Sequence, residues 1–129
     1  MLVQQDLIEQ RVHTAADPYG GWSIDLHPAD GVYSENPGCT QLHAKGVYQI
    51  PYSTMVTPHV SNLFLAGRII SASHVAFGST RVMATCANGA QAVGLAAALA
   101  VKNDLLARDF CEGQNLELLQ RMLVRSGQY

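Results

Sequence analysis

The sequence predicts an α+β fold in which short strands pack against one long helix and two helices near the C-terminus. Three patterns carry this prediction. Apolar and polar residues alternate over 22–26, which is the period of a half-buried strand. Residues 80–101 are almost all small and carry no charge from Val82 onward, as in a helix packed inside a protein. Leucine and methionine recur at helical spacing over 115–125, which predicts an amphipathic helix.

In the first half of the chain, regular elements alternate with turn-forming residues. Prolines at positions 18, 28 and 51 end the first helix and the two strands, because proline lacks the N–H that either structure needs. The stretch between the strands is rich in Gly, Pro, Asn, Asp and Ser, which is typical of a loop. The expected elements are a helix over 2–12, a strand over 22–26, a loop over 29–39, a strand over 46–50 and a connection over 53–61.

The second half begins with the continuous apolar run Leu63–Ala66, which is typical of a strand covered on both faces. Gly67 ends this strand, and Ser79 or Thr80 can cap the helix that follows. The expected elements are a strand over 63–66, a loop over 68–77, a long buried helix over about 80–101, a short helix over 103–110 and a third helix over 115–125.

The composition narrows the classes of function. Only 14% of the 129 residues are charged, against roughly 25% in ordinary soluble domains, so the chain is expected to bury surface against something else. The formal charge of −2 provides no basic field for nucleic acid. Three cysteines without a CxxC pair indicate free thiols, and the N-terminus lacks the layout of a signal peptide, so we expect a cytoplasmic protein.

The uncharged run Val82–Val101 has the length of a membrane span, which needs about 20 residues. Ala and Gly dominate it, and Thr85, Asn88 and Gln91 interrupt it, so its insertion into lipid would be weakly driven. We therefore expect a buried helix and no membrane partner, with a small membrane-associated protein as a remaining alternative.

Most motifs of catalysis and metal binding are missing from this sequence. The segment Phe77–Arg81 lacks the second glycine of a GxSxG elbow, and the five histidines form no metal-binding spacing, so no metal is expected. Asp25 and His27 lie two apart on one strand and share a face, so they could form an acid/base pair or bind a polar substrate. The alternative is a solvated polar face.

The eleven glycines contain no GxGxxG triplet, so a complete dinucleotide site is not encoded in this chain. The chain does contain a strand ending in Ala66-Gly67-Arg68 and a predicted helix start at 78–81 followed by small residues. Free N–H groups at a helix start hold phosphates and electron-rich ring edges. These two features together suggest part of a cofactor site.

Three motifs, found at residues 17–27, 50–53 and 62–99, follow one another in the chain: DPYGGWSIDLH, IPYS and the long NLFLAGRIISASHVAFGSTRVMATCANGAQAVGLAAAL. In these motifs the chain resembles the C-terminal part of bacterial FAD-dependent oxidoreductases that have two dinucleotide-binding domains. The resemblance implies a fragment of an FAD-binding, Rossmann-like flavoprotein. Residues 1–61 would belong to the substrate-facing region and the return connection, and residues 62–129 to the C-terminal part of the FAD-binding domain.

The resemblance also implies roles for individual residues, with Gly67 and Arg68 beside the FAD pyrophosphate or ribityl chain. The helix start would lie beside the flavin pyrimidine edge, through Gly78, Ser79, Thr80, Arg81 and Val82. The candidates for catalysis and substrate contact are His74, Tyr52, Asp25 and His27. Ser53 stands where family members usually carry Arg, which puts the identity of the substrate in question.

The expected partners are the N-terminal half of the same flavoprotein, which would supply the GxGxxG turn, and a small-molecule substrate. The isolated chain would then have no activity of its own and would self-associate through uncovered apolar surface. An alternative of another class is a stand-alone helical interaction module that packs on a partner through its apolar helix.

Overall fold

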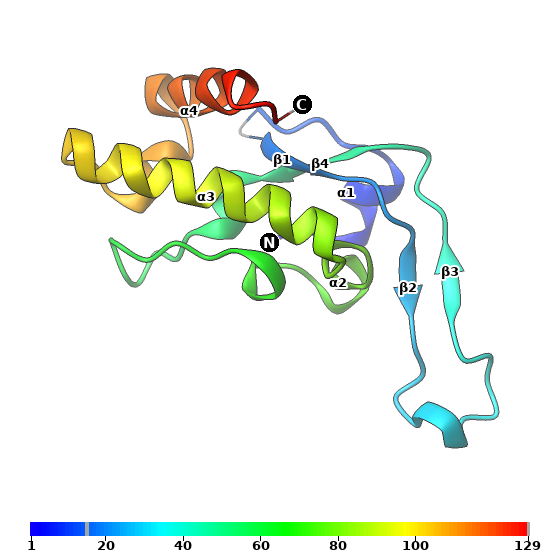
Figure 1. Cartoon of the computed structure of the whole chain (residues 1–129). Coiled ribbons are helices and arrows are strands. Elements are labelled where there is room, and N and C mark those ends of the chain that lie inside the picture. Colours follow the sequence, from blue (N-terminus) through cyan, green and yellow to red (C-terminus); the bar gives the residue numbers. More distant parts are fainter. Residues whose placement is uncertain (15, 129) are drawn as a thin grey trace.

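The computed structural model describes residues 1–14 and 16–128 and confirms an α+β fold (Figure 1). Its strands form two antiparallel pairs. β1 (Ala16–Gly20) pairs with β4 (Tyr48–Pro51), and β2 (Ile24–Leu26) pairs with β3 (Thr40–Leu42). The long helix α3 (Met83–Asn103) passes across the first pair, as Figure 1 shows.

One face of α3 makes the centre of the core. Gly89 lies over β1 and over the 3₁₀ turn Tyr52–Met55, where a Cβ atom would be 3.4 Å from Met55 Cε and 3.8 Å from Pro18 Cγ. The far end of α3 packs against α4 (Gly113–Arg125). The largest fully buried side chains are Tyr48, Tyr52, Phe110, Leu2, Leu7, Ile24, Ile50, Met55, Leu119 and Leu123.

The β2–β3 pair extends away from α3 as a narrow ribbon (Figure 1). A 3₁₀ turn, Gly31–Tyr33, lies in its end loop within the expected loop region and leaves Val32 and Tyr33 almost fully exposed. At its base, β2 packs against α2 (His74–Thr80). The ribbon therefore places Asp25 and His27 beside α2.

The predicted helix over 2–12 is wrong in extent, because α1 covers only Gln4–Ile8. Leu2 is buried in a parallel bridge instead: its N–H donates to the Ser71 carbonyl at 2.9 Å and its carbonyl accepts from Ser73 N–H at 2.8 Å. Gln10 has a left-handed backbone, with φ of 52°, which breaks the helical course. The helical spacing of the apolar residues therefore arose from two separate structures, the bridge at Leu2 and the short helix α1.

The predicted strand over 63–66 does not form. Phe64 makes one isolated antiparallel bridge with Val56, and Leu65 N–H donates to the Met55 carbonyl at 2.7 Å. A strand covered on both faces needs hydrogen-bonding neighbours along its length. The described residues supply only this short contact, and Leu63 remains exposed.

The predicted long helix over about 80–101 is confirmed as the continuous helix α3, which begins later, at Met83, after a turn at Arg81 and Val82. α2 begins inside the predicted loop, with Ser73 as its N-cap accepting a hydrogen bond from Ala76 N–H at 3.3 Å. α3 then begins after Val82, whose extended backbone makes it the N-cap without a capping side chain. Ser79 and Thr80 therefore end α2 and do not cap α3, contrary to the prediction.

α4 confirms the predicted third helix, with Leu116, Leu119 and Leu123 buried on one stripe. The helix expected over 103–110 is only a 3₁₀ turn, Ala107–Phe110, because Asp104 takes a left-handed conformation directly after α3. β4 matches the predicted second strand shifted by about two residues, an ordinary uncertainty for strand ends.

α3 is half-exposed and not buried all round as predicted. Its 21 residues are apolar enough to cross a membrane by length and composition alone, and 33% of its most apolar window is buried inside the protein. The buried residues are Thr85, Gly89, Ala92, Ala96, Leu99 and Ala100. The opposite face of the helix is bare.

Candidate functional site

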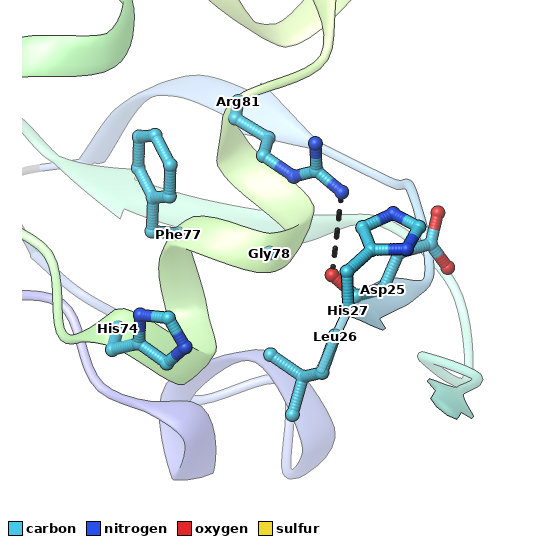
Figure 2. A pocket seen from close by; sticks show the side chains of 7 residues that line it. All are labelled: Asp25, Leu26, His27, His74, Phe77, Gly78 and Arg81. Carbon is cyan, nitrogen blue, oxygen red and sulfur yellow. Dashed lines mark hydrogen bonds between the residues drawn. The ribbon is translucent and has the colours of Figure 1, made fainter. Parts of the chain in front are cut away.

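Five of the residues predicted to form the site line one pocket of about 180 Å³ between α2 and β2. We call it the α2–β2 pocket. It joins segments about fifty positions apart in the sequence, as Figure 2 shows. Its lining residues are Asp25, Leu26, His27, His74, Phe77, Gly78 and Arg81.

Gly78 allows α2 and β2 to approach closely. A Cβ atom at this position would lie 2.8 Å from the Asp25 carbonyl oxygen and 3.2 Å from Leu26 Cδ2. The contact with the Asp25 carbonyl cannot be relieved without moving the strand backbone. The structure thus gives Gly78 a packing role that holds the two walls of the pocket together.

Arg81 reaches from the end of α2 toward β2 (Figure 2). Its guanidinium Nη2 donates to the Asp25 carbonyl at 3.4 Å, which is a long hydrogen bond. The Arg81 carbonyl in turn accepts from Arg68 Nε at 3.4 Å. Arg68 follows Gly67, which takes a φ of 70° at the start of the 3₁₀ turn Gly67–Ile69. Arg68 therefore contacts the turn that precedes α3, whereas a Cβ atom at Gly67 would lie 3.9 Å from Cys86 in α3 itself.

The two histidines of the α2–β2 pocket differ in their partners. His27 Nδ1 lies 2.8 Å from the Gly38 carbonyl, and because a carbonyl only accepts, Nδ1 carries the hydrogen. Nε2 is then free to face a ligand. His74 is exposed at the first position of α2 and makes no hydrogen bond within the described residues.

Asp25 is held by a neighbour that sequence reasoning missed. Trp22 Nε1 donates to Asp25 Oδ2 at 2.7 Å, while Oδ1 is shielded from solvent without a partner among the described residues. The pattern GGW just before the strand could have drawn attention to Trp22, since its indole N–H lies three residues from a carboxylate.

Ser79 and Thr80 are buried beneath the turn at Arg81 and Val82. Ser79 Oγ donates to the Trp22 carbonyl at 2.6 Å, so the Tyr48 hydroxyl must donate to Ser79 Oγ, also at 2.6 Å. Burial raises the pKa of Tyr48, and its hydrogen bond to Ser79 partly opposes that rise. Thr80 Oγ1 has no partner within the described residues. These side chains brace the turn from inside.

A second pocket of about 330 Å³ lies on the other side of the same turn, at the start of α3. We call it the α3-start pocket. Among the described residues, the N–H groups of Met83, Ala84 and Thr85 make no hydrogen bond. Asn88 Nδ2 fixes the opposite wall by donating to the Tyr19 carbonyl at 3.4 Å. The lining residues are Tyr19, Gly20, Gly21, Trp22, Val47, Val82, Ala84, Thr85 and Asn88.

Five of the predicted site residues line neither pocket, namely Gly67, Arg68, Ser79, Thr80 and Tyr52. Among them, Tyr52 lies in the hydrophobic core. It is 0% exposed and packs against Phe110 with ring centroids 6.2 Å apart. Burial raises the pKa of Tyr52 far above its ordinary range, with Cys111 adding to the rise. Its hydroxyl has no partner within the described residues.

A family model described as FAD dependent oxidoreductase matches residues 1–123 of the chain. The chain belongs to this family. No curated protein and no solved structure matches it. The match spans the β2–β3 ribbon, both pockets and most of α4, so it includes every residue discussed above as part of the site.

Proposed function

We propose that this chain is the C-terminal portion of an FAD-dependent oxidoreductase, and that the start of α3 forms the flavin-ring side of the FAD site. The observation that carries this proposal is the set of free N–H groups on Met83, Ala84 and Thr85 beside the α3-start pocket. A helix start stabilises an anion by about 0.3–1 kcal/mol, and by up to ~2 where partly buried. FAD takes up electrons from a substrate, and its pyrimidine edge becomes more negative as it does so.

The residues present fit one edge of a flavin. Ala84 and Thr85 bring the backbone of the first helical turn to the pocket, and Gly20 and Gly21 face it without side chains. Arg68 donates to the Arg81 carbonyl at the adjacent turn and adds positive charge close to the helix start. At about 330 Å³ the α3-start pocket is at the small end of ligand sites, in keeping with one part of a larger cofactor.

The bare face of α3 supports a missing partner domain. Six exposed residues recur at intervals of three or four and carry no charge. Met83 and Val101 at its ends are 83% and 88% exposed. Apolar surface of this kind is rarely left uncovered in a monomer. We assign the N-terminal half of the flavoprotein to this bare stripe, which consists of Met83, Ala87, Ala90, Gly94, Ala98 and Val101.

The bare stripe also favours a second candidate, a stand-alone interaction module that packs on another protein. The sequence upstream of Met1 distinguishes the two functions. An in-frame GxGxxG with an acidic residue about 20 positions further on supports the flavoprotein. A start codon with no such segment before it supports the module.

Substitution of Met83 tests the flavin contact through a single backbone N–H. Met83→Pro removes that N–H at the first helical position, where proline is tolerated, and Val82 before it already has the extended backbone that proline requires. In the full-length protein we expect the flavin midpoint potential to fall by about 20 mV, as for about 1 kcal/mol in a two-electron couple.

Met83→Leu is the matched control, because it keeps the N–H and changes only the side chain. Its potential should equal that of the unmodified protein. Spectroelectrochemical titration of both variants decides between the outcomes. Equal potentials in Met83→Pro and Met83→Leu, with FAD bound in both, would remove the start of α3 from the flavin site.

A further inference from the structure

The α2–β2 pocket combines nitrogen-rich side chains with apolar walls. His74 and Phe77 lie on its α2 side, Leu26 and His27 on its β2 side, and Arg81 reaches across from the end of α2 (Figure 2). With a volume of about 180 Å³ it has room for a small group and not for a nucleotide. Its chemistry therefore concerns a substrate-sized ligand.

Arg81 has unused hydrogen-bonding capacity. Its guanidinium has five N–H donors, and within the part of the chain that the structure describes only one of them is engaged, in the 3.4 Å bond to the Asp25 carbonyl. Within the described residues it forms no ion pair with a carboxylate. A planar guanidinium with free donors on one side matches a carboxylate with two parallel hydrogen bonds.

The two histidines can add donors to the same ligand. The Gly38 carbonyl fixes His27 with its hydrogen on Nδ1, so its free Nε2 donates to an anion when the ring is protonated. His74 has no partner among the described residues, so either tautomer is open to it and one ring nitrogen can donate without protonation.

Asp25 is the carboxylate nearest to the pocket, and its charge is turned elsewhere. Its Oδ2 accepts from Trp22 Nε1 at 2.7 Å, and Figure 2 shows the carboxylate pointing away from α2. The backbone of Asp25 contacts Arg81, and its side chain does not. Apart from Asp25, the polar side chains of the lining are therefore Arg81, which is a charged donor, His74, which can donate, and His27, which donates from Nε2 when protonated.

We propose that the α2–β2 pocket binds a carboxylate group of the substrate. Arg81 is the charge partner, His27 and His74 are the auxiliary donors, and Leu26 and Phe77 contact an apolar portion next to the carboxylate. That this carboxylate belongs to the substrate rests on the proposed flavoenzyme function, whereas its binding to Arg81 does not.

Calorimetric titration with benzoate tests the proposal, with benzamide as the uncharged analogue of the same shape. We expect the full-length protein to bind benzoate at least about tenfold more tightly than benzamide. Arg81→Gln should remove that preference, and Arg81→Lys should retain part of it. Arg125→Gln, at the exposed end of α4, is the matched control and should leave both affinities unchanged.

Equal binding of benzoate and benzamide, or no binding of benzoate, would overturn the proposal. Should Arg81→Gln fail to fold, the comparison between Arg81→Lys and the unmodified protein carries the test. The visible absorbance of bound flavin is recorded on the same samples. If the protein holds no flavin but still prefers benzoate through Arg81, the proposed function is wrong and the carboxylate site stands. If the protein holds flavin but does not prefer benzoate, the carboxylate site is wrong and the proposed function stands.

Discussion

The two faces of α3 are made of the same small residues but have opposite surroundings. On the inner face, Gly89 and Ala92 pack against β1 and the 3₁₀ turn Tyr52–Met55. On the outer face, Gly94 has no atom within 4 Å of the place where a Cβ would stand, and Ala90 is exposed. A helix that is apolar all round is normally buried all round. This difference is what the proposed partner domain would explain, since it would cover the outer face.

This contrast extends to the two pockets that flank the start of α3. The α2–β2 pocket presents polar side chains, among them Arg81, His27 and His74. The α3-start pocket also has side chains in its lining, and in addition it borders the start of a helix that has no capping side chain. Side chains of one chain can bind a ligand by themselves. The backbone N–H groups of a helix start bind an anion only if other parts of the site hold it over them.

The largest difference between the two faces of α3 is expected when the same large side chain is placed on each. In the 129-residue chain, Gly89→Leu should cost about 2–3 kcal/mol, because its side chain meets Met55 and Pro18. Gly94→Leu should stabilise by roughly 0.5–1 kcal/mol through helix propensity, since space around Gly94 is open. Denaturant unfolding measures both, and equal effects would contradict the assignment of the faces.

When the rest of the protein is present, the substitution at Gly94 should become harmful as well. In the full-length protein, Gly94→Leu should prevent close packing of the partner domain against the outer face and lower the flavin content several-fold. Flavin absorbance per protein measures this effect. Full flavin content in that variant would show that nothing packs closely at Gly94. Lys102→Leu, beyond the bare stripe at the end of α3, serves as the control.

Removal of the buried bracing under the α3 start should have a smaller effect. Ser79→Ala leaves the Tyr48 hydroxyl and the Trp22 carbonyl without their partner, and should destabilise the chain by about 1–2 kcal/mol. Tyr48→Phe in the Ser79→Ala background should recover part of that loss, because it removes the unpaired hydroxyl. Additive losses in the double variant would mean that the two side chains do not interact.

The smallest effect is expected at Tyr52, below the inner face. Its hydroxyl has no partner among the described residues, so Tyr52→Phe should be neutral or stabilise by up to about 1 kcal/mol near neutral pH. Because burial raises the folded pKa, the unfolded tyrosine ionises first, and stability present below about pH 10 is lost above it. Unfolding curves between pH 8 and pH 11 should show a shallower alkaline loss in Tyr52→Phe; an unchanged slope would contradict this.

The parts of the fold that the sequence predicted well are those whose burial pattern is complete within the chain. The stripe of Leu116, Leu119 and Leu123 predicts α4 because each of these residues is buried by its own neighbours. The run 80–101 carries no such periodic signal, since alanine and glycine are alike on every face. The break at Arg81 and Val82 was therefore missed, and 63–66 was predicted as a strand although the described residues supply only one bridging partner.

The sequence could predict which site residues lie together only where two of them share one face of a strand. Asp25 and His27 lie two apart on β2 and its exit, so their common location followed from the strand period alone. His74 and Arg81 were reached only through the family resemblance, because α2 and β2 meet through the absence of a side chain at Gly78. Close approach of two backbones leaves no periodic pattern in a sequence.

The most direct test of the central claim compares FAD binding by the 129-residue chain alone and by the same chain expressed together with the segment encoded upstream. Each sample is incubated with excess FAD, separated from free cofactor by gel filtration and assayed for bound flavin. We expect the isolated chain to be colourless and the joined protein to retain about one FAD per molecule. Stoichiometric FAD on the isolated chain, or none on the joined protein, would contradict the account of α3 as one side of a shared flavin site.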